Sequence, residues 1–192
     1  MELVLFVLKS AALGVGLAMD AFSVSMANGL NETNMKLRKM IYIAGTFAFF
    51  QIAMPLIGWL CVHTIVETFT YFQRFIPFIA LGLLGYIGGK MLIEGLKGEE
   101  AQEEAAVDFK SLMIQGVATS IDALSVGFTI SEYSALSALS ASIIIGIVTF
   151  IICMFGLKIG KKVGMKLSSK ASILGGVILI LIGLEIFIGG VF

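Results

Sequence analysis

Six apolar segments, each long enough to cross a lipid bilayer, constrain this chain more than any other feature of its sequence. A helix needs about 20 mostly apolar residues to span the hydrocarbon core. Hydrophobic residues make up 58% of the chain and charged residues only 14%, whereas soluble domains carry roughly 25% charged residues. The sequence therefore predicts an all-α integral membrane protein. The predicted transmembrane helices are residues 3–28, 37–61, 74–96, 110–130, 134–157 and 171–191.

The distribution of lysine and arginine predicts the orientation of these spans. Eleven of the thirteen basic residues lie beside three joints: between spans one and two, three and four, and five and six. Only Lys9 and Arg74 lie beside the other span ends. Because cytoplasmic loops carry the excess of basic residues, both termini are predicted to be outside. The N-terminus has no basic region of the kind that precedes a cleavable signal, so residues 3–28 count as the first span.

Two stretches of the chain repeat one another. Residues 14–26 read "GVGLAMDAFSVSM" and residues 116–128 read "GVATSIDALSVGF", with six of the thirteen paired positions identical. This frame places Asp20 inside the first span and Asp122 inside the fourth. A charged side chain at the bilayer centre costs about 2.5–3.5 kcal/mol, and ionisable residues there mark function by default. Weaker similarities link span two to five and span three to six, so the repeat extends over the whole chain.

The repeat divides a single membrane domain, residues 1–192, into two three-helix units. Repeat one is residues 1–97, repeat two is residues 109–192, and an acidic cytoplasmic linker at 98–108 joins them. Because three is an odd number, the second unit must insert upside down relative to the first. Inverted repeats of this kind are typical of transporters that bind substrate near the bilayer midplane. We therefore expect the two aspartates to approach each other there.

The polar residues near the aspartates predict a cation site. A serine follows each aspartate by three residues, so its hydroxyl shares a helix face with the carboxylate. Oxygen ligands of this type suit Mg²⁺, Ca²⁺ or Mn²⁺, whereas Cu(I) and Zn²⁺ favour thiolate or imidazole. The alternative is a structural polar contact between helices. The candidate ligands are Asp20, Asp122, Ser23, Ser125, Thr119, Asn28 and Gln51.

Four motifs together resemble those of the bacterial manganese efflux pumps of the MntP type: "GLAMDAFSVSMANG", "FFQIAMPLIGW", "GGKMLIEG" and "ATSIDALSVG". The resemblance covers essentially the whole chain. It implies a six-span protein of the bacterial inner membrane that exports Mn²⁺ and needs Asp20 and Asp122 for activity. Some members of that family carry glutamate where this chain has Gln51, and the neutral amide removes one charge from the candidate site.

The predicted function is a secondary transporter, not an enzyme, that exports Mn²⁺ as a metal/proton antiporter. The sequence contains no G-x-x-x-x-G-K-[ST] loop, so an ion gradient or the membrane potential must supply the energy. Moving two positive charges outward costs about 4.6 kcal/mol per 100 mV, which entering protons offset. Mn²⁺ is expected as the substrate and not as a resident cofactor. Equal numbers of acidic and basic residues leave no basic footprint for nucleic acid.

Two other functions remain open from the sequence. One is export of a different cation, such as another divalent metal or a cationic amino acid. The other is an intramembrane aspartyl protease, although neither aspartate stands in the G-x-G-D pattern of those enzymes.

Further residues allow both a functional and a structural interpretation. A charge pair between spans three and six is one interpretation of Lys90 and Glu185, with Glu94 as a further candidate partner. The alternative is that these side chains snorkel to the membrane surface. The acidic residues of the linker either collect cytoplasmic cations before transport or form a solvated connector between the two repeats. The glycines around Asp20, and Pro55 in span two, are candidate points where a helix unwinds and turns backbone carbonyls toward an ion.

Overall fold

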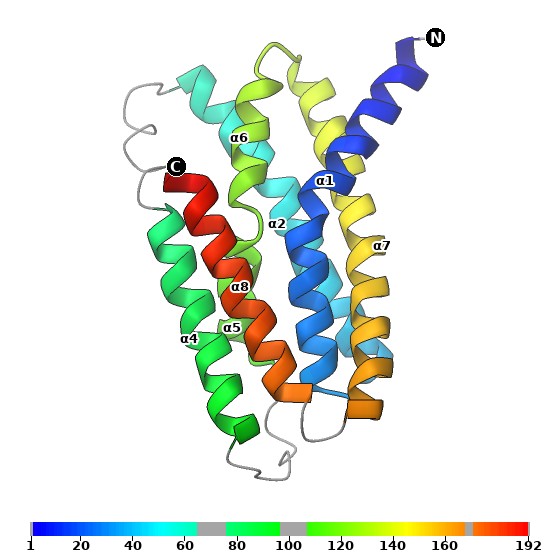
Figure 1. Cartoon of the computed structure of the whole chain (residues 1–192). Coiled ribbons are helices and arrows are strands. Elements are labelled where there is room, and N and C mark those ends of the chain that lie inside the picture. The colour runs from blue at the N-terminus through cyan, green and yellow to red at the C-terminus, as the bar shows by residue number, and fades with distance from the viewer. Residues whose placement is uncertain (1, 65–75, 97–106, 168–170, 192) are drawn as a thin grey trace.

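The computed structural model of the chain is a bundle of α-helices (Figure 1). The structure describes residues 2–64, 76–96, 107–167 and 171–191, and the regular elements within these ranges are all helices, as the sequence predicts. Five of the predicted spans are single helices and the fourth is two helices. The elements are α1 (Glu2–Asn31), α2 (Leu37–Thr64), α4 (Ile76–Leu96), α5 (Phe109–Ala118), α6 (Ile121–Thr129), α7 (Ala135–Leu167) and α8 (Ala171–Val191).

Successive passes run in alternating directions, and both ends of the chain lie at the same end of the bundle (Figure 1). Among the described residues, α1, α2 and α7 contain stretches long and apolar enough to cross a membrane: Leu3–Asn31, Leu37–Val62 and Ala135–Gly164. The 30 residues of α1 extend about 45 Å at 1.5 Å per residue, which exceeds the roughly 30 Å of a bilayer core. These dimensions are those of a multi-pass membrane protein.

The fourth predicted span is interrupted halfway along the bundle, between α5 and α6 (Figure 1). Two hydroxyl residues occupy the interruption. Thr119 donates its side-chain hydrogen bond to the carbonyl of Gln115 at 2.9 Å, and Ser120 donates to the carbonyl of Gly116 at 2.7 Å. Hydroxyls that bond back to preceding carbonyls compete with backbone amides for the same acceptors. The sequence at the break therefore favours the end of one helix and the start of another.

The candidate break points in spans one and two are both helical, so neither span unwinds there. α1 continues through Asp20 and α2 continues through Pro55. In the repeated frame, Leu17 and Ala18 stand where the two hydroxyl residues of the break stand in the fourth span. Neither side chain has a donor that could compete with the backbone. The two copies of the repeat therefore differ in sequence at the two positions where they differ in conformation.

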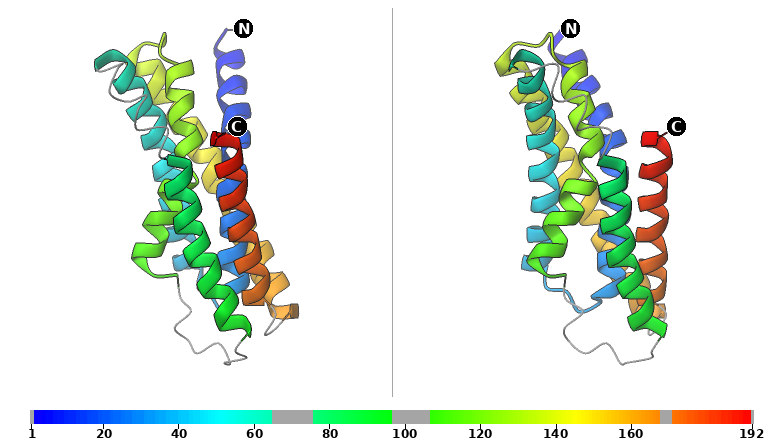
Figure 2. Two further views of the ribbon diagram at one scale, coloured as in Figure 1. Left: turned by 60° about the vertical axis from the view of Figure 1, so that its left-hand side comes forward. Right: turned by 90° about the vertical axis from the view of Figure 1, so that its left-hand side faces the viewer.

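The helices of the two halves are interleaved. α1 packs chiefly against α7, α2 packs against α7 and α6, and α4 pairs with α8, as Figure 2 shows from two further sides. Glycines allow these close approaches. Gly156 of α7 lies against the carbonyl of Phe22 in α1, where an added Cβ would stand 2.7 Å from the oxygen, and Gly58 of α2 lies against the carbonyl of Leu124 in α6. Small residues of this kind are typical of helix contacts in membranes.

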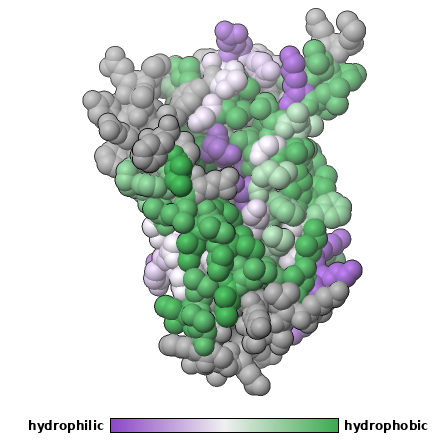
Figure 3. All heavy atoms as spheres, viewed as in Figure 1, coloured by the Kyte–Doolittle hydropathy of each residue, from purple (hydrophilic) through white to green (hydrophobic). Residues whose placement is uncertain are grey.

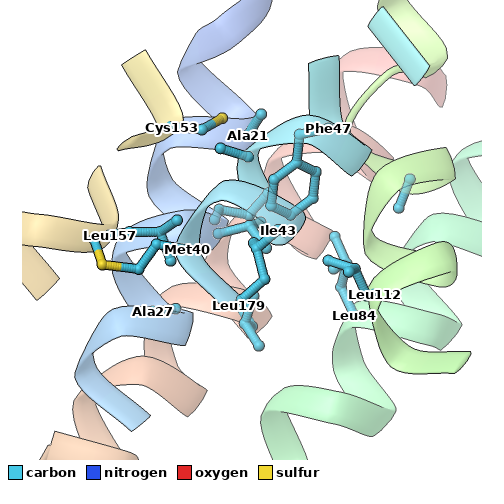
Figure 4. Close-up of a cluster of buried hydrophobic side chains, with 14 of the residues drawn as sticks. Ala21, Ala27, Met40, Ile43, Phe47, Leu84, Leu112, Cys153, Leu157 and Leu179 are labelled. Carbon is cyan, nitrogen blue, oxygen red and sulfur yellow. The ribbon is translucent and has the colours of Figure 1, made fainter. Parts of the chain in front are cut away.

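A buried apolar cluster occupies the half of the bundle that contains α5 (Figure 4). It draws side chains from α1, α2, α4, α5, α7 and α8, so it joins the two halves of the chain. A second, smaller cluster joins Leu17 of α1, Ala123 of α6 and Ile145 of α7. Leu17 precedes Asp20 by three residues and Ala123 follows Asp122 directly. The second cluster therefore holds the first and fourth predicted spans together close to the aspartates.

Candidate ion-binding site

Asp20 and Asp122 come from different halves of the chain and approach each other. Asp20 lies in the middle of α1, and Asp122 lies in the first turn of α6, just after the break. Their carboxylates are close enough for the two charges to interact. The carboxylate of Asp122 also accepts a hydrogen bond of 2.8 Å from the backbone amide of Ala123. In the space-filling view, hydrophilic atoms are visible at the surface between α6 and α1 (Figure 3).

Gln51 of α2 bridges the two copies of the repeated frame beside the aspartates. Its side-chain nitrogen donates to the carbonyl of Leu17 at 3.2 Å and to the carbonyl of Thr119 at 3.0 Å. Each of these carbonyls belongs to the residue three positions before an aspartate. A single buried amide thus contacts equivalent points in both halves, and it touches the break itself.

The remaining predicted ligands are distributed unevenly around this point. The hydroxyl of Ser23 donates to the carbonyl of Met19 at 3.1 Å within α1, and Ser125 is exposed on α6. Thr119 is buried at the break. Asn28 is buried two turns from Asp20 and donates its amide to Gln115 of α5 at 2.8 Å. The side-chain nitrogen of Asn28 therefore forms a hydrogen bond between α1 and α5.

The predicted charge pair and the acidic linker fall largely outside the described residues. Lys90 is exposed on α4. Glu94 and Glu185 belong to α4 and α8, but their side chains are outside the part of the chain that the structure describes, as are residues 98–106 of the linker. The pairing of Lys90 and the role of the linker acids stay predictions.

Acidic and soft metal ligands are few in the described part of the bundle. No group of three or more His, Cys, Asp or Glu side chains gathers there. A cation held between Asp20 and Asp122 would therefore need neutral oxygens for its other ligands.

Three polar residues near the site were not among the predicted ligands. Gln115 and Ser120 form the hydrogen bonds described above, and Thr149 of α7 is buried. Ser120 could have been found by comparing the two repeats, because it replaces Ala18 beside a repeated aspartate. Thr149 occupies roughly the place in span five that Gln51 occupies in span two, which leaves it equally open to line the pathway or to bond between helices. Gln115 carries no such signal, since a single polar residue in an apolar helix is common.

Comparison with known proteins identifies the family. Residues 34–187 match the family model described as "Putative manganese efflux pump". A protein of that name, MntP, from Clostridium perfringens (strain SM101 / Type A) is 40% identical over 204 residues, which cover 95% of this chain and 94% of the relative. Its namesake from Gloeothece citriformis is 40% identical over 95% of both chains, and that from Methanobrevibacter smithii is 41% identical over 92% and 94%. No solved structure matches the chain.

These relatives are named as pumps, which are transporters and not enzymes, as the sequence predicts. The match covers most of each chain, including the first repeated aspartate, which precedes the residues matched by the family model. The chain belongs to the MntP family of manganese efflux pumps.

Proposed function

We propose that this protein is a secondary transporter that exports Mn²⁺ from the cytoplasm through a site formed by Asp20 and Asp122. The observation that carries the proposal is that the amide of Gln51 bonds to the carbonyls three residues before each aspartate, one in each half of the chain. The two carboxylates, that of Asp20 half-buried and that of Asp122 exposed, are thereby close enough for their charges to interact among apolar helices. A charge at membrane depth is costly, and two like charges repel each other. A divalent cation between them removes both penalties. The names of the relatives supply the identity of the ion.

An inverted repeat, with a two-fold axis through the site, is part of the proposal. Two glycine contacts support it. Phe22 and Leu124 are as far apart in sequence as the two aspartates, and each carbonyl faces a glycine: Gly156 for Phe22 and Gly58 for Leu124. The contact between α1 and α7 thus resembles the contact between α6 and α2, as a two-fold axis requires.

Metal/proton antiport in the bacterial inner membrane completes the proposal, with the basic joints in the cytoplasm and both termini outside. The charge of the cargo supports this coupling. Export of Mn²⁺ alone against an inside-negative potential costs about 4.6 kcal/mol per 100 mV. If protons replace the metal on the carboxylates during the return step, their entry offsets that cost.

Transport by purified protein in proteoliposomes tests the proposal. Mn²⁺ uptake is followed with a trapped metal-sensitive dye, and proton movement with a trapped pH-sensitive dye. Wild type should move Mn²⁺ in one direction and protons in the other. Asp20→Asn and Asp122→Asn should each abolish both movements. Asp108→Asn is the matched control, because Asp108 caps α5 outside the apolar spans and asparagine caps equally well.

Two results would contradict the proposal. Wild-type rates in both asparagine variants of the site would show that the carboxylates are packing contacts. Failure of folded wild type to move Mn²⁺, while it moves another cation, would overturn the assignment of the substrate.

A further inference from the structure

Gln51 and Thr149 each carry a buried oxygen without a hydrogen-bond partner among the described residues. The atoms are the side-chain oxygen Oε1 of Gln51 and the hydroxyl Oγ1 of Thr149, and both side chains are completely buried. Buried polar groups nearly always have a partner, and leaving one unpaired costs about 1–3 kcal/mol. A third such atom among the described residues, the hydroxyl Oγ of Ser25, lies more than one turn beyond Asp20, where Ser25 packs against Gly156 of α7. The two atoms of Gln51 and Thr149 require an explanation.

The unpaired oxygen of Gln51 lies beside the candidate ion site. The nitrogen of the same amide bonds to the carbonyls of Leu17 and Thr119, three residues before the aspartates. Both hydrogens of the amide are therefore used, and the orientation of the oxygen is fixed. Pro55 adds a second oxygen at this point. Proline has no N–H, so the backbone carbonyl of Gln51 does not receive the helical hydrogen bond from residue 55.

Thr149 faces α1 at the same depth. Gly14 of α1 lies against Ile145 and Val148, and further along Phe22 lies against Gly156. Thr149 stands between these contacts along α7, opposite about residue 16 of α1, which is one helical turn before Asp20. It also shares the α1-facing side of α7, since it follows Ile145 by one turn. Its hydroxyl thus belongs to the same layer of the bundle as Gln51.

Coordination chemistry relates these oxygens to the ion. Mn²⁺ favours six oxygen ligands in octahedral geometry, and the described residues gather no third acidic side chain to supply them. The remaining ligands must be neutral oxygens that are not already satisfied. Oε1 of Gln51 and Oγ1 of Thr149 meet both conditions.

We infer that Gln51 and Thr149 are neutral ligands of the transported divalent cation, contributing Oε1 and Oγ1 from α2 and α7 to the site of the two aspartates. This inference rests on the proposed function. It gives the site four contributing helices, α1, α2, α6 and α7, and balances two carboxylates against the two charges of the metal.

Equilibrium binding of Mn²⁺ to the purified full chain in detergent tests the inference. The electron paramagnetic resonance signal of free Mn²⁺ disappears when the ion binds, which gives the dissociation constant without any transport step. Thr149→Val and Gln51→Met should each weaken binding about tenfold, within the range seen when metal sites lose a supporting group. Thr149→Ser, which keeps the hydroxyl, should bind within twofold of wild type.

Matched controls separate a ligand from a packing residue. Thr46 of α2 is also buried, but its hydroxyl bonds to the carbonyl of Tyr42 at 2.9 Å, so Thr46→Val should leave the dissociation constant unchanged. Gln115→Met is the corresponding control for Gln51. In the absence of metal, Thr149→Val should melt at or above the temperature of wild type, because valine removes an unpaired polar atom.

Binding as tight as wild type in folded Thr149→Val and Gln51→Met would overturn the inference. If Gln51→Met does not fold, the dissociation constant of Thr149→Val alone tests the inference. The proposed function would survive that result if Asp20→Asn and Asp122→Asn still abolished binding. It would fail together with the inference only if wild type bound no Mn²⁺.

Discussion

Asn28 of α1 donates a hydrogen bond of 2.8 Å to the side-chain oxygen of Gln115 in α5, and both amides are buried. In the repeated frame, the corresponding residues are Ile130 and Leu13, which are apolar. The contact therefore has no polar counterpart in the other half of the repeat. It ties α1 to α5 on the side of the break away from α6.

A double-mutant cycle should measure this contact. Asn28→Ala, Gln115→Ala and the double variant should give a coupling free energy of about 0.6–1.7 kcal/mol, the range found for hydrogen bonds between helices in membranes. Thermal unfolding in detergent provides the measurement. Additive effects of the two single substitutions would mean that the bond contributes nothing to stability.

The break between α5 and α6 should close when its hydroxyl residues are replaced by their counterparts in α1. Thr119→Leu with Ser120→Ala gives the fourth span the residues Leu17 and Ala18 that stand at the same positions of a continuous helix. We expect slower amide hydrogen exchange at residues 119–122 and loss of transport.

Ser140→Ala is the control for this experiment, because Ser140 makes the same kind of bond to the carbonyl of Leu136 inside continuous α7. It should leave exchange and transport unchanged. Unaltered exchange in the double variant would show that tertiary contacts, and not the hydroxyls, hold the break open.

Glycine substitutions should separate close helix contacts from open positions. A Cβ at Gly156 would stand 2.7 Å from the carbonyl oxygen of Phe22, and one at Gly58 would overlap the carbonyl of Leu124. Because these obstacles are backbone, Gly156→Ala and Gly58→Ala should sharply reduce the folded fraction in size-exclusion chromatography. Gly16→Ala and Gly45→Ala, with no atom within 4 Å of the new Cβ, should match wild type or exceed its stability.

Asp108 should stabilise the start of α5 in a pH-dependent way. Its carboxylate accepts a hydrogen bond of 3.1 Å from the backbone amide of Ser111, and hydrogen bonding to Ser111 lowers the pKa of Asp108 from its usual 3.8. Asp108→Ala should cost about 0.5–1 kcal/mol at neutral pH. Because the pKa is lower in the folded state, this contribution is present above 3.8 and is lost as the pH falls through the folded value.

Melting temperatures of wild type and Asp108→Ala at neutral and acidic pH check this prediction. The difference between the two proteins should be full near pH 7 and should shrink below pH 3.8. A difference that grows on acidification would contradict the capping role.

The sequence was sufficient to predict that the chain is helical and carries long apolar helices, whereas a shared site of the two aspartates stays a prediction. Span lengths depend on apolar runs, which are local, and the repeated frame placed Asp20 and Asp122 at equivalent positions. The sequence analysis left open whether spans one and two unwind, and it did not point to the break in the fourth span. Glycine and proline were weighed as helix breakers in spans one and two, but α1 and α2 are continuous. The interruption lies instead in the fourth span, where Thr119 and Ser120 bond to preceding carbonyls.

The partners of Asn28 and Gln51 could not be predicted from the sequence. Both residues were assigned as ligands by their helical spacing, which gives the face of a helix but not the neighbour opposite. Asn28 meets an amide 87 residues away, and the nitrogen of Gln51 reaches carbonyls 34 and 68 residues away. Such contacts depend on how the six passes interleave, which single-helix patterns do not encode.

The interleaving of the helices also bears on how the protein is made. α1 emerges first from the ribosome, but its principal neighbour is α7, which is synthesised more than a hundred residues later. The glycine contact between Phe22 and Gly156 cannot form until then. The early helices must therefore wait in the bilayer as separate spans, with Asp20 unshielded, until the second half of the chain is inserted. Two half-chains expressed from separate messages should then accumulate only when they are produced together.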